Sequence, residues 1–198
     1  EREGEDYETH IRELLPTEDG WLVAAPYEYQ GQVATPPTHP TGRPDTCSSD
    51  DARGLWTAEA AHPSWLSGDY ELVRHDPHTF YNGERDANGE FVGINRPETI
   101  TLQPDGRVTS GGAVSFFDTP EANLPRSTDG PAVRGTWRML GDCGPAGVRC
   151  CDTDMAITLD GVTYTGVFAE LPRETDGRTT LTFSAIGGNR TIWGARLA

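Results

Sequence analysis

Carboxylates dominate the side chains that could do chemistry in this chain. Its 198 residues include 31 Asp and Glu against 16 basic residues, all of them Arg because there is no Lys. A general acid needs a pKa raised by burial, and so many acids make chance pairs inevitable. We therefore assign no catalytic residue and expect mostly solvated groups among the acids on or beside the expected strands: Asp69, Glu71, Glu98, Asp152, Asp154, Glu170 and Glu174.

Histidines offer a second kind of chemistry. His75 and His78 flank Asp76, and imidazole and carboxylate groups are common metal ligands. A loop position with a single carboxylate is more often a polar turn, so we predict no metal site in this chain.

Cysteines provide a third kind of chemistry. The four residues Cys47, Cys143, Cys150 and Cys151 form an even set that allows three pairings. We favour disulfides over free buried thiols or a zinc site: Cys143 could close a loop with Cys150 while Cys151 reaches Cys47, but disulfide geometry leaves the pairing open. Disulfides would indicate an oxidising compartment and a secreted protein.

Aromatic side chains could bind sugars through their apolar faces. Trp56, Trp65 and Tyr81 are the candidates for such a substrate-binding role because they fall in the irregular parts of the sequence. Phe183 and Trp193 lie instead within alternating strand patterns, so we expect them to pack in the core.

The net charge of −15 excludes several partners. An acidic surface repels nucleic-acid phosphates and anionic membranes, and no apolar run approaches the roughly 20 residues of a membrane-spanning helix. No signal peptide is visible at Glu1, which we interpret as a mature or cut end.

The elements that position these groups are β-strands. Alternating apolar residues predict strands at 155–159, 162–168, 179–185 and 191–196, separated by Asp160-Gly161, Asp176-Gly177 and Gly187-Gly188. Such pairs favour the positive-φ turns of hairpins, so a four-stranded antiparallel meander follows. Its Tyr164, Phe168 and Phe183 face should be apolar, and its threonine face wettable.

The rest of the chain continues this pattern. Strands are expected at 11–15, 21–29, 69–74, 98–103, 107–109, 113–117 and 133–140. Short strands without helical periodicity predict an all-β fold with a small antiparallel barrel. We divide the chain into a hairpin at 1–32, a proline-rich linker at 33–66 and the barrel at 67–198. Two strands cannot bury a core, so the hairpin must dock on the barrel or on a partner.

Six segments in order carry a family resemblance: residues 9–32, 67–75, 100–106, 134–137, 157–168 and 181–196. Together they resemble the end of the last propeller blade and the C-terminal β-barrel of the endo-α-1,5-L-arabinanases of glycoside hydrolase family 43. The chain departs from the family at 169–174 and in its proline-rich and cysteine-bearing insertions, which puts the substrate in doubt.

The resemblance implies that the hairpin belongs to a propeller blade and that the chain is a non-catalytic C-terminal portion. Its partner would be a catalytic five-bladed propeller chain or domain acting on arabinan or a related arabinofuranosyl polysaccharide. The two carboxylates of the inverting mechanism and a calcium ion would lie in that propeller, and no cofactor is expected in this chain. His10 falls in the wrong segment to serve as the calcium-site histidine.

Two other classes of function stay open. The chain could be a free-standing carbohydrate-binding module that uses the candidate aromatic residues. It could also be a lipocalin-like carrier, since a barrel of eight strands can hold one small ligand; bulky residues such as Tyr164, Phe168, Phe183 and Trp193 would more readily fill such a lumen.

Overall fold

A computed structural model describes residues 11–17, 19–37, 62–75, 98–111, 131–140 and 153–197. The four cysteines, Trp56, Tyr81, His10, Asp76, His78, Asp152 and the expected strand at 113–117 lie outside these ranges. All regular elements of the described part are strands. None of its segments is a helix that could span a membrane.

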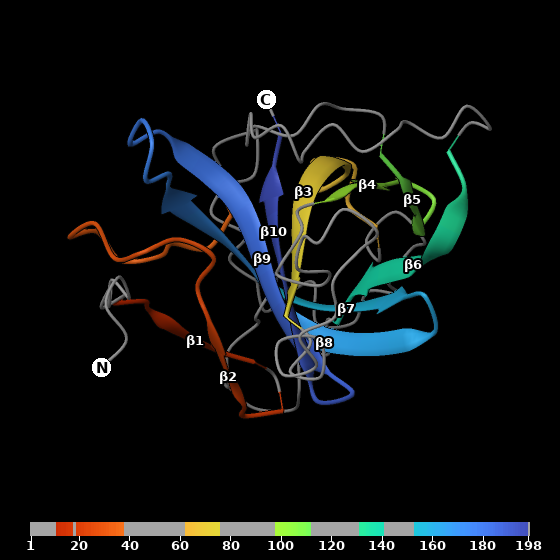
Figure 1. Cartoon of the computed structure of the whole chain (residues 1–198), viewed down its shortest axis with the longest axis horizontal. Coiled ribbons are helices and arrows are strands. Elements are labelled where there is room, and N and C mark those ends of the chain that lie inside the picture. Colours follow the sequence, from red (N-terminus) through yellow and green to blue (C-terminus); the bar gives the residue numbers. More distant parts are fainter. Residues whose placement is uncertain are drawn as a thin grey trace, which may run out of the picture.

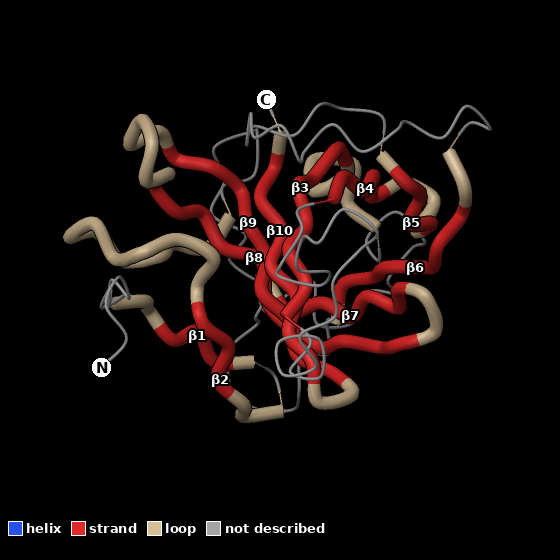
Figure 2. The backbone as a smooth tube through the Cα atoms, viewed as in Figure 1, coloured by secondary structure: helices blue, strands red, loops and turns tan. Residues whose placement is uncertain are grey.

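Eight of the strands form one closed antiparallel barrel in the order β10-β3-β4-β5-β6-β7-β8-β9 (Figures 1 and 2). They are β3 (Gly68–His75), β4 (Glu98–Leu102), β5 (Arg107–Ser110), β6 (Val133–Met139), β7 (Asp154–Leu159), β8 (Val162–Pro172), β9 (Thr179–Gly187) and β10 (Arg190–Arg196). The predicted all-β barrel and its C-terminal meander are confirmed.

Local turn chemistry explains the tightest connection. Asp160 and Gly161 join β7 to β8 with φ angles of 49° and 82°, as a type I′ hairpin turn requires at both central residues. The turn between β9 and β10 lies one residue later than the sequence predicts, because Gly188 and Asn189 take the positive φ angles of 57° and 62°. Gly187 is then the last residue of β9.

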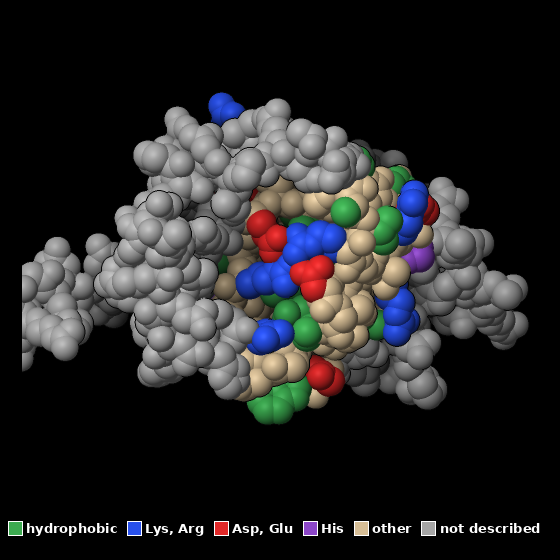
Figure 3. All heavy atoms as spheres, turned by 45° about the vertical axis from the view of Figure 1, so that its right-hand side comes forward, with side chains coloured by type: hydrophobic (Ala, Val, Ile, Leu, Met, Phe, Trp, Pro, Cys, Tyr) green, Lys and Arg blue, Asp and Glu red, His purple; other side chains and the backbone are tan. Residues whose placement is uncertain are grey.

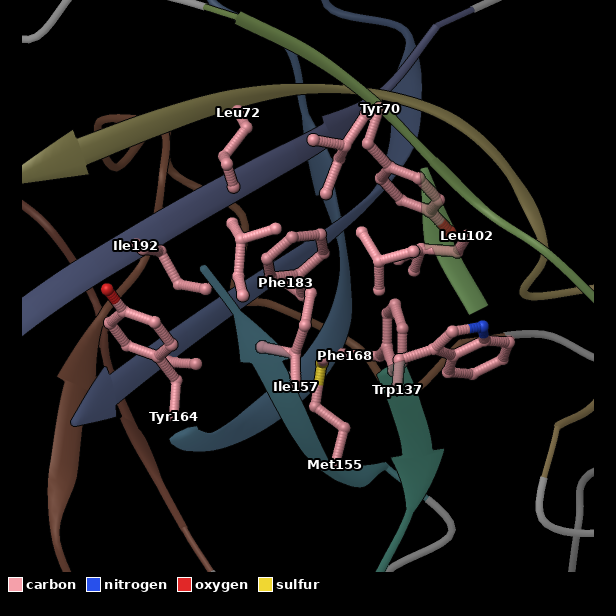
Figure 4. Packing of buried hydrophobic residues seen from close by; sticks show 14 of the residues in the cluster. Tyr70, Leu72, Leu102, Trp137, Met155, Ile157, Tyr164, Phe168, Phe183 and Ile192 are labelled. Atoms are coloured by element: carbon pink, nitrogen blue, oxygen red, sulfur yellow. The ribbon is translucent and has the colours of Figure 1, made fainter. Parts of the chain in front are cut away.

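The barrel lumen is filled by side chains. Trp137, Tyr70, Tyr164, Phe168 and Phe183 are all buried to within 1% of complete, and they converge from different strands (Figure 4). Phe183 contacts Tyr70 and Phe168 with ring centres 5.5 and 5.8 Å apart. Two polar groups of this core bond backbone carbonyls: Tyr70 donates to Leu66 at 2.6 Å and Trp137 to Gln103 at 2.8 Å.

Trp193 is the exception to the predicted core. Side chains alternate faces along a strand, and on β10 the fully buried residue is Ile192. Trp193 therefore points to the outside of the barrel, where its ring contacts His75. The predicted alternation is present, but its phase on this strand is the reverse of that expected. Among the described residues, Trp137 is the tryptophan buried in the core.

The N-terminal strands β1 (Leu14–Pro16) and β2 (Leu22–Ala24) form a separate two-stranded antiparallel sheet. Both are shorter than the predicted 11–15 and 21–29. Pairing continues beyond them through single backbone bonds, such as Tyr29 donating to Ile11. Figures 1 and 2 show this hairpin beside the barrel, next to β8 and β9.

Candidate functional site

The hairpin docks on the outer surface of the barrel. Leu15, Val23 and Ala25 pack with Val167, Ala169 and Leu171 of β8 in a second apolar cluster. Ser184 of β9 donates to the carbonyl of Ala24 at 2.7 Å. The expectation that the outer, threonine-bearing face of the meander is wettable is therefore wrong here: Thr182 and Ser184 are fully buried.

The segment that follows the hairpin adds polar contacts to this interface. The backbone of Thr35 pairs with Glu170 of β8 in both directions. Glu174, one of the acids considered in the sequence analysis, accepts a hydrogen bond from the amide of Glu28 at 2.5 Å. Burial raises the pKa of Tyr27 to about 12 although the Arg173 guanidinium opposes the shift. The hairpin and its extension thus form one continuous interface with the barrel.

The other face of the hairpin is apolar and exposed. Leu14, Trp21 and Leu22 are 57%, 64% and 54% exposed, and the register pairs Pro16 with Leu22. Among the described residues, six of the seven exposed large hydrophobic side chains belong to this N-terminal segment: Ile11, Leu14, Trp21, Leu22, Tyr29 and Val33. Leu14 and Leu22 lie opposite the buried Leu15 and Val23, and we call these two residues the hairpin outer face. Such concentration on a surface marks an interaction site rather than scattered apolar residues.

Within the described residues, one edge of β1 is not paired with another strand. In the described part of the chain β1 pairs with β2 alone. Bonds such as Thr17 donating to Trp21 and Ala25 donating to Glu13 place the odd-numbered backbone groups of β1 toward β2, so the groups of Leu14 face away. An unpaired edge is a template for another strand.

A charged network closes one mouth of the barrel. Arg74 at the end of β3 and a bulged Arg134 of β6 each bind both Glu98 and Asp160. Arg74 lies 2.5 Å from each of these carboxylates, and Nη2 of Arg134 lies 2.5 Å from Asp160. We call these four residues the mouth network; Figure 3 shows acidic and basic side chains against one another on the face that it draws.

The mouth network is suited to holding strands together rather than to acid–base catalysis. Glu98 and Asp160 each accept hydrogen bonds from the same two guanidinium groups, and such charge-assisted bonds are strong. Hydrogen bonding from Arg134 lowers the pKa of Asp160 despite partial burial. A general acid needs the opposite shift.

The other described acids are spread over separate parts of the barrel. Asp69 accepts a hydrogen bond from Thr101, and Glu71 and Asp154 are buried at 7% and 2% exposure. Glu170 lies on β8, facing the segment after the hairpin. Asp69 and Glu71 lie on β3, Asp154 on β7 and Glu170 on β8.

Trp65 is the one sugar-binding candidate within the described residues. It is partly buried and packs against the barrel core, and its carbonyl accepts a hydrogen bond from Arg196 at 2.6 Å. Only part of its ring can therefore meet a sugar. Trp56, Tyr81 and the four cysteines stay predictions because they lie outside the described residues. No cluster of metal-ligand type occurs in the described ranges.

The sequence predicted that the hairpin docks on the barrel or on a partner, but it did not show which residues form the hairpin outer face. Its signal was present, since the apolar residues on both faces of 11–15 and 21–29 exceed what one docked face needs. It also missed the mouth network, whose members lie up to 86 residues apart. Nothing local in the sequence marks such a set.

Comparison with known proteins shows the family to which the barrel belongs. Residues 51–194 match the family model GH43_C, described as a C-terminal lipocalin-like domain. The search of curated proteins gives no significant match.

Solved structures show the same fold. A family 43 glycoside hydrolase, the YxiA protein of Bacillus licheniformis, superimposes with a TM-score of 0.54 at 22% identity, over 95% of this chain and 28% of that one. The endo-1,5-alpha-L-arabinanase of Thermotoga petrophila RKU-1 gives 0.53 at 19% identity, over 94% and 28%, and its complex with Tris gives 0.52, over 96% and 29%. The chain thus spans less than a third of the length of these proteins. Coverage this high must include the hairpin, which precedes the family match.

Proposed function

Because the chain belongs to the GH43_C family of C-terminal lipocalin-like domains, we propose that it is the non-catalytic C-terminal portion of a secreted family 43 glycoside hydrolase. The substrate of the whole enzyme would be arabinan or a related arabinofuranosyl polysaccharide. In this proposal the chain docks on a catalytic propeller chain or domain and helps to shape its substrate cleft.

The exposed hairpin outer face carries this proposal. A two-stranded sheet that buries one face on the barrel still leaves Leu14, Trp21 and Leu22 in water, at a cost that a partner surface would remove. The free edge of β1 could accept a strand of that partner, and main-chain hydrogen bonds would fix the register. The similar solved proteins contain this region and have more than two thirds of their length outside it.

The arrangement of charges supports a non-catalytic role. The carboxylates that come together, Glu98 and Asp160, are paired with arginines. We expect the catalytic carboxylates, and a calcium ion, in the propeller portion. Purified chain should therefore release no sugar from arabinan, whereas hydrolysis by the chain alone would overturn the proposal.

Docking can be tested by titrating the purified chain against the catalytic propeller portion that this proposal requires. We expect a one-to-one complex by calorimetry and gel filtration. Leu14→Glu and Leu22→Glu should each weaken it at least about tenfold, because a charge at the centre of an interface loses more than 1.4 kcal/mol of binding free energy.

Val133→Glu is the matched control for these variants. Val133 is 58% exposed on β6, so it resembles Leu14 in exposure but lies on the barrel. Its replacement should leave the affinity unchanged. Equal losses for Val133→Glu and Leu14→Glu would show that net charge, not the hairpin outer face, governs binding.

Secretion is a further part of the proposal. Disulfides among Cys47, Cys143, Cys150 and Cys151 would fit an oxidising compartment. Mass spectrometry of unreduced protein should find no free thiol. Four free thiols in natively purified material would contradict secretion.

Neither alternative class is favoured by a specific observation. A carbohydrate-binding module would show measurable affinity for arabinan oligomers by the isolated chain, lost on Trp65→Ala. A small-ligand carrier would need lumen space, and the lumen is occupied by fully buried rings such as Phe183 and Tyr164.

A further inference from the structure

A polar contact holds the hairpin on the barrel in addition to its apolar cluster. The guanidinium of Arg12, just before β1, lies 4.7 Å from the ring centre of Trp193 on β10. Arg12 also donates to the carbonyls of Ala25, at 3.3 Å, and of Pro26. One side chain thus joins both arms of the hairpin to the outer surface of β10.

His75 approaches the same tryptophan from β3. The two ring centres are 4.2 Å apart at an interplanar angle of 63°. The Nε2 atom of His75 is buried and has no hydrogen-bond partner among the described residues. A neutral imidazole tolerates this site, but an imidazolium would bury an N–H donor and a charge without an acceptor.

The charges around His75 oppose a second proton. Arg12 of the N-terminal segment faces His75. On β10, Thr191 is paired with His75, and Trp193 and Arg190 lie nearby. On β3, the residue before His75 is Arg74. Burial lowers the pKa of His75, and the Arg12 charge lowers it further. Within the described residues, no carboxylate offsets these effects.

We propose that Arg12, Trp193 and His75 form a pH-sensitive switch that releases the N-terminal hairpin from the barrel when His75 is protonated. Two cations would then share one indole ring within 5 Å of its centre. Undocking removes Arg12 and opens His75 to water, so the open hairpin binds the proton more tightly. By linkage, acid shifts the hairpin from docked to open.

The pH window follows from the direction of the shift. In the open form His75 has its ordinary pKa near 6.5, and in the docked form its pKa is lower. Docking is therefore at full strength above about pH 6.5. It weakens by at most about tenfold per pH unit between the two pKa values, because one proton is linked, and is constant below both. Any effect of this release on a docked catalytic portion rests on the proposed function. The release of the hairpin from the barrel does not.

Amide hydrogen exchange of the full chain from pH 8 to pH 5, corrected for intrinsic rates, tests the switch. The reporters are the amides of Thr17 and Ala25, which bond within the hairpin, and the reference is the amide of Trp137 in the barrel. We expect the hairpin opening constant to rise at least several-fold toward pH 5 while the reference stays flat.

His75→Phe keeps a ring against Trp193 but cannot titrate, so the hairpin should open equally at every pH. His75→Gln is a second variant in case the phenyl ring disturbs folding. His62→Phe is the matched control: His62 contacts Trp137 with ring centres 5.6 Å apart, away from the hairpin, and should keep the pH dependence.

Two results would overturn the switch: no pH dependence in the parent chain, or the same dependence in both His75 variants. Neither touches the proposed function when docking of the catalytic portion is titrated at pH 8, where the hairpin is held on the barrel. Conversely, failure to bind that portion at pH 8 would overturn the proposed function and leave the switch intact.

Discussion

The paired charges at the barrel mouth show that the role of a single residue depends on the partners that it contacts. Glu98 and Asp160 are unremarkable members of a chain with 31 acids. Each binds the same two arginines, and their side chains are only 26% and 41% exposed. Because the four groups share their contacts and are partly screened by solvent, we expect the network to stabilise the fold by an amount near the upper end of the range for surface ion pairs.

Asp160→Asn tests this at the residue scale. Asn tolerates the positive φ of 49° at this turn position, so the change removes charge rather than geometry. Hydrogen bonding from Arg134 lowers the pKa of Asp160 in the folded protein. Its stabilisation is therefore present above the unfolded pKa near 4 and is lost as pH falls through the folded pKa.

We expect Asp160→Asn to lower the unfolding free energy by about 1 kcal/mol at pH 7 and by less toward pH 2. Urea unfolding at both pH values measures this. Asp105→Asn, at a pair in which both side chains are more than half exposed, should change stability little at pH 7. A loss of equal size for both variants would contradict a special role for the mouth network.

The hairpin shows how an element with too little core of its own is stabilised. β1 and β2 have three residues each, and a two-stranded sheet is marginal alone. Its inward residues Leu15 and Val23 are 8% and 3% exposed because β8 covers them. The same alternation that buries these two residues leaves Leu14 and Leu22 in solvent.

Val23→Asp and Leu22→Asp form a matched pair at the element scale. Asp at position 23 would place a charge in the apolar cluster, which is costly without a partner. We expect the amides of Thr17 and Ala25 to lose protection from hydrogen exchange while the barrel amides keep theirs. Leu22→Asp should leave both sets protected; uniform loss across the chain in Val23→Asp would show that hairpin and barrel unfold as one unit.

At the scale of the whole molecule, the closed barrel is a filled scaffold with two differently used surfaces. Aromatic rings occupy the lumen, the mouth network covers one end, and the hairpin covers the outside of β8 and β9. The partner contacts that we propose are therefore external. A fold described as lipocalin-like need not carry a ligand, because function resides in sites rather than folds.

Phe183→Ala tests the filled lumen. Removing a fully buried ring should lower the unfolding free energy by about 3–5 kcal/mol, through lost burial and the cavity left behind. Native parent protein should not bind an apolar fluorescent probe such as 8-anilinonaphthalene-1-sulfonate in the lumen, whereas a folded variant should bind it. Tight, stoichiometric probe binding by the parent that is competed by fatty acid would support a carrier instead.

The sequence by itself determined the strands and the sharpest turns. Period-two alternation and pairs such as Asp160-Gly161 act over a few residues, so β3 to β10 could be placed within a few residues of their ends. Side-chain identity also indicated most of the core, including Tyr164, Phe168 and Phe183. These features depend on local conformation and on which residues avoid water.

Only the tertiary structure decided which outer surfaces are buried and which charges meet. Trp193 lies outside because barrel closure turns Ile192 inward, Thr182 and Ser184 are buried because the hairpin covers them, and Arg74 meets Asp160 across 86 residues. Alternation tells that a strand has two faces, but not what packs on each. The register of a closed barrel and the docking of a distant segment settle that, since both depend on contacts between residues far apart in sequence.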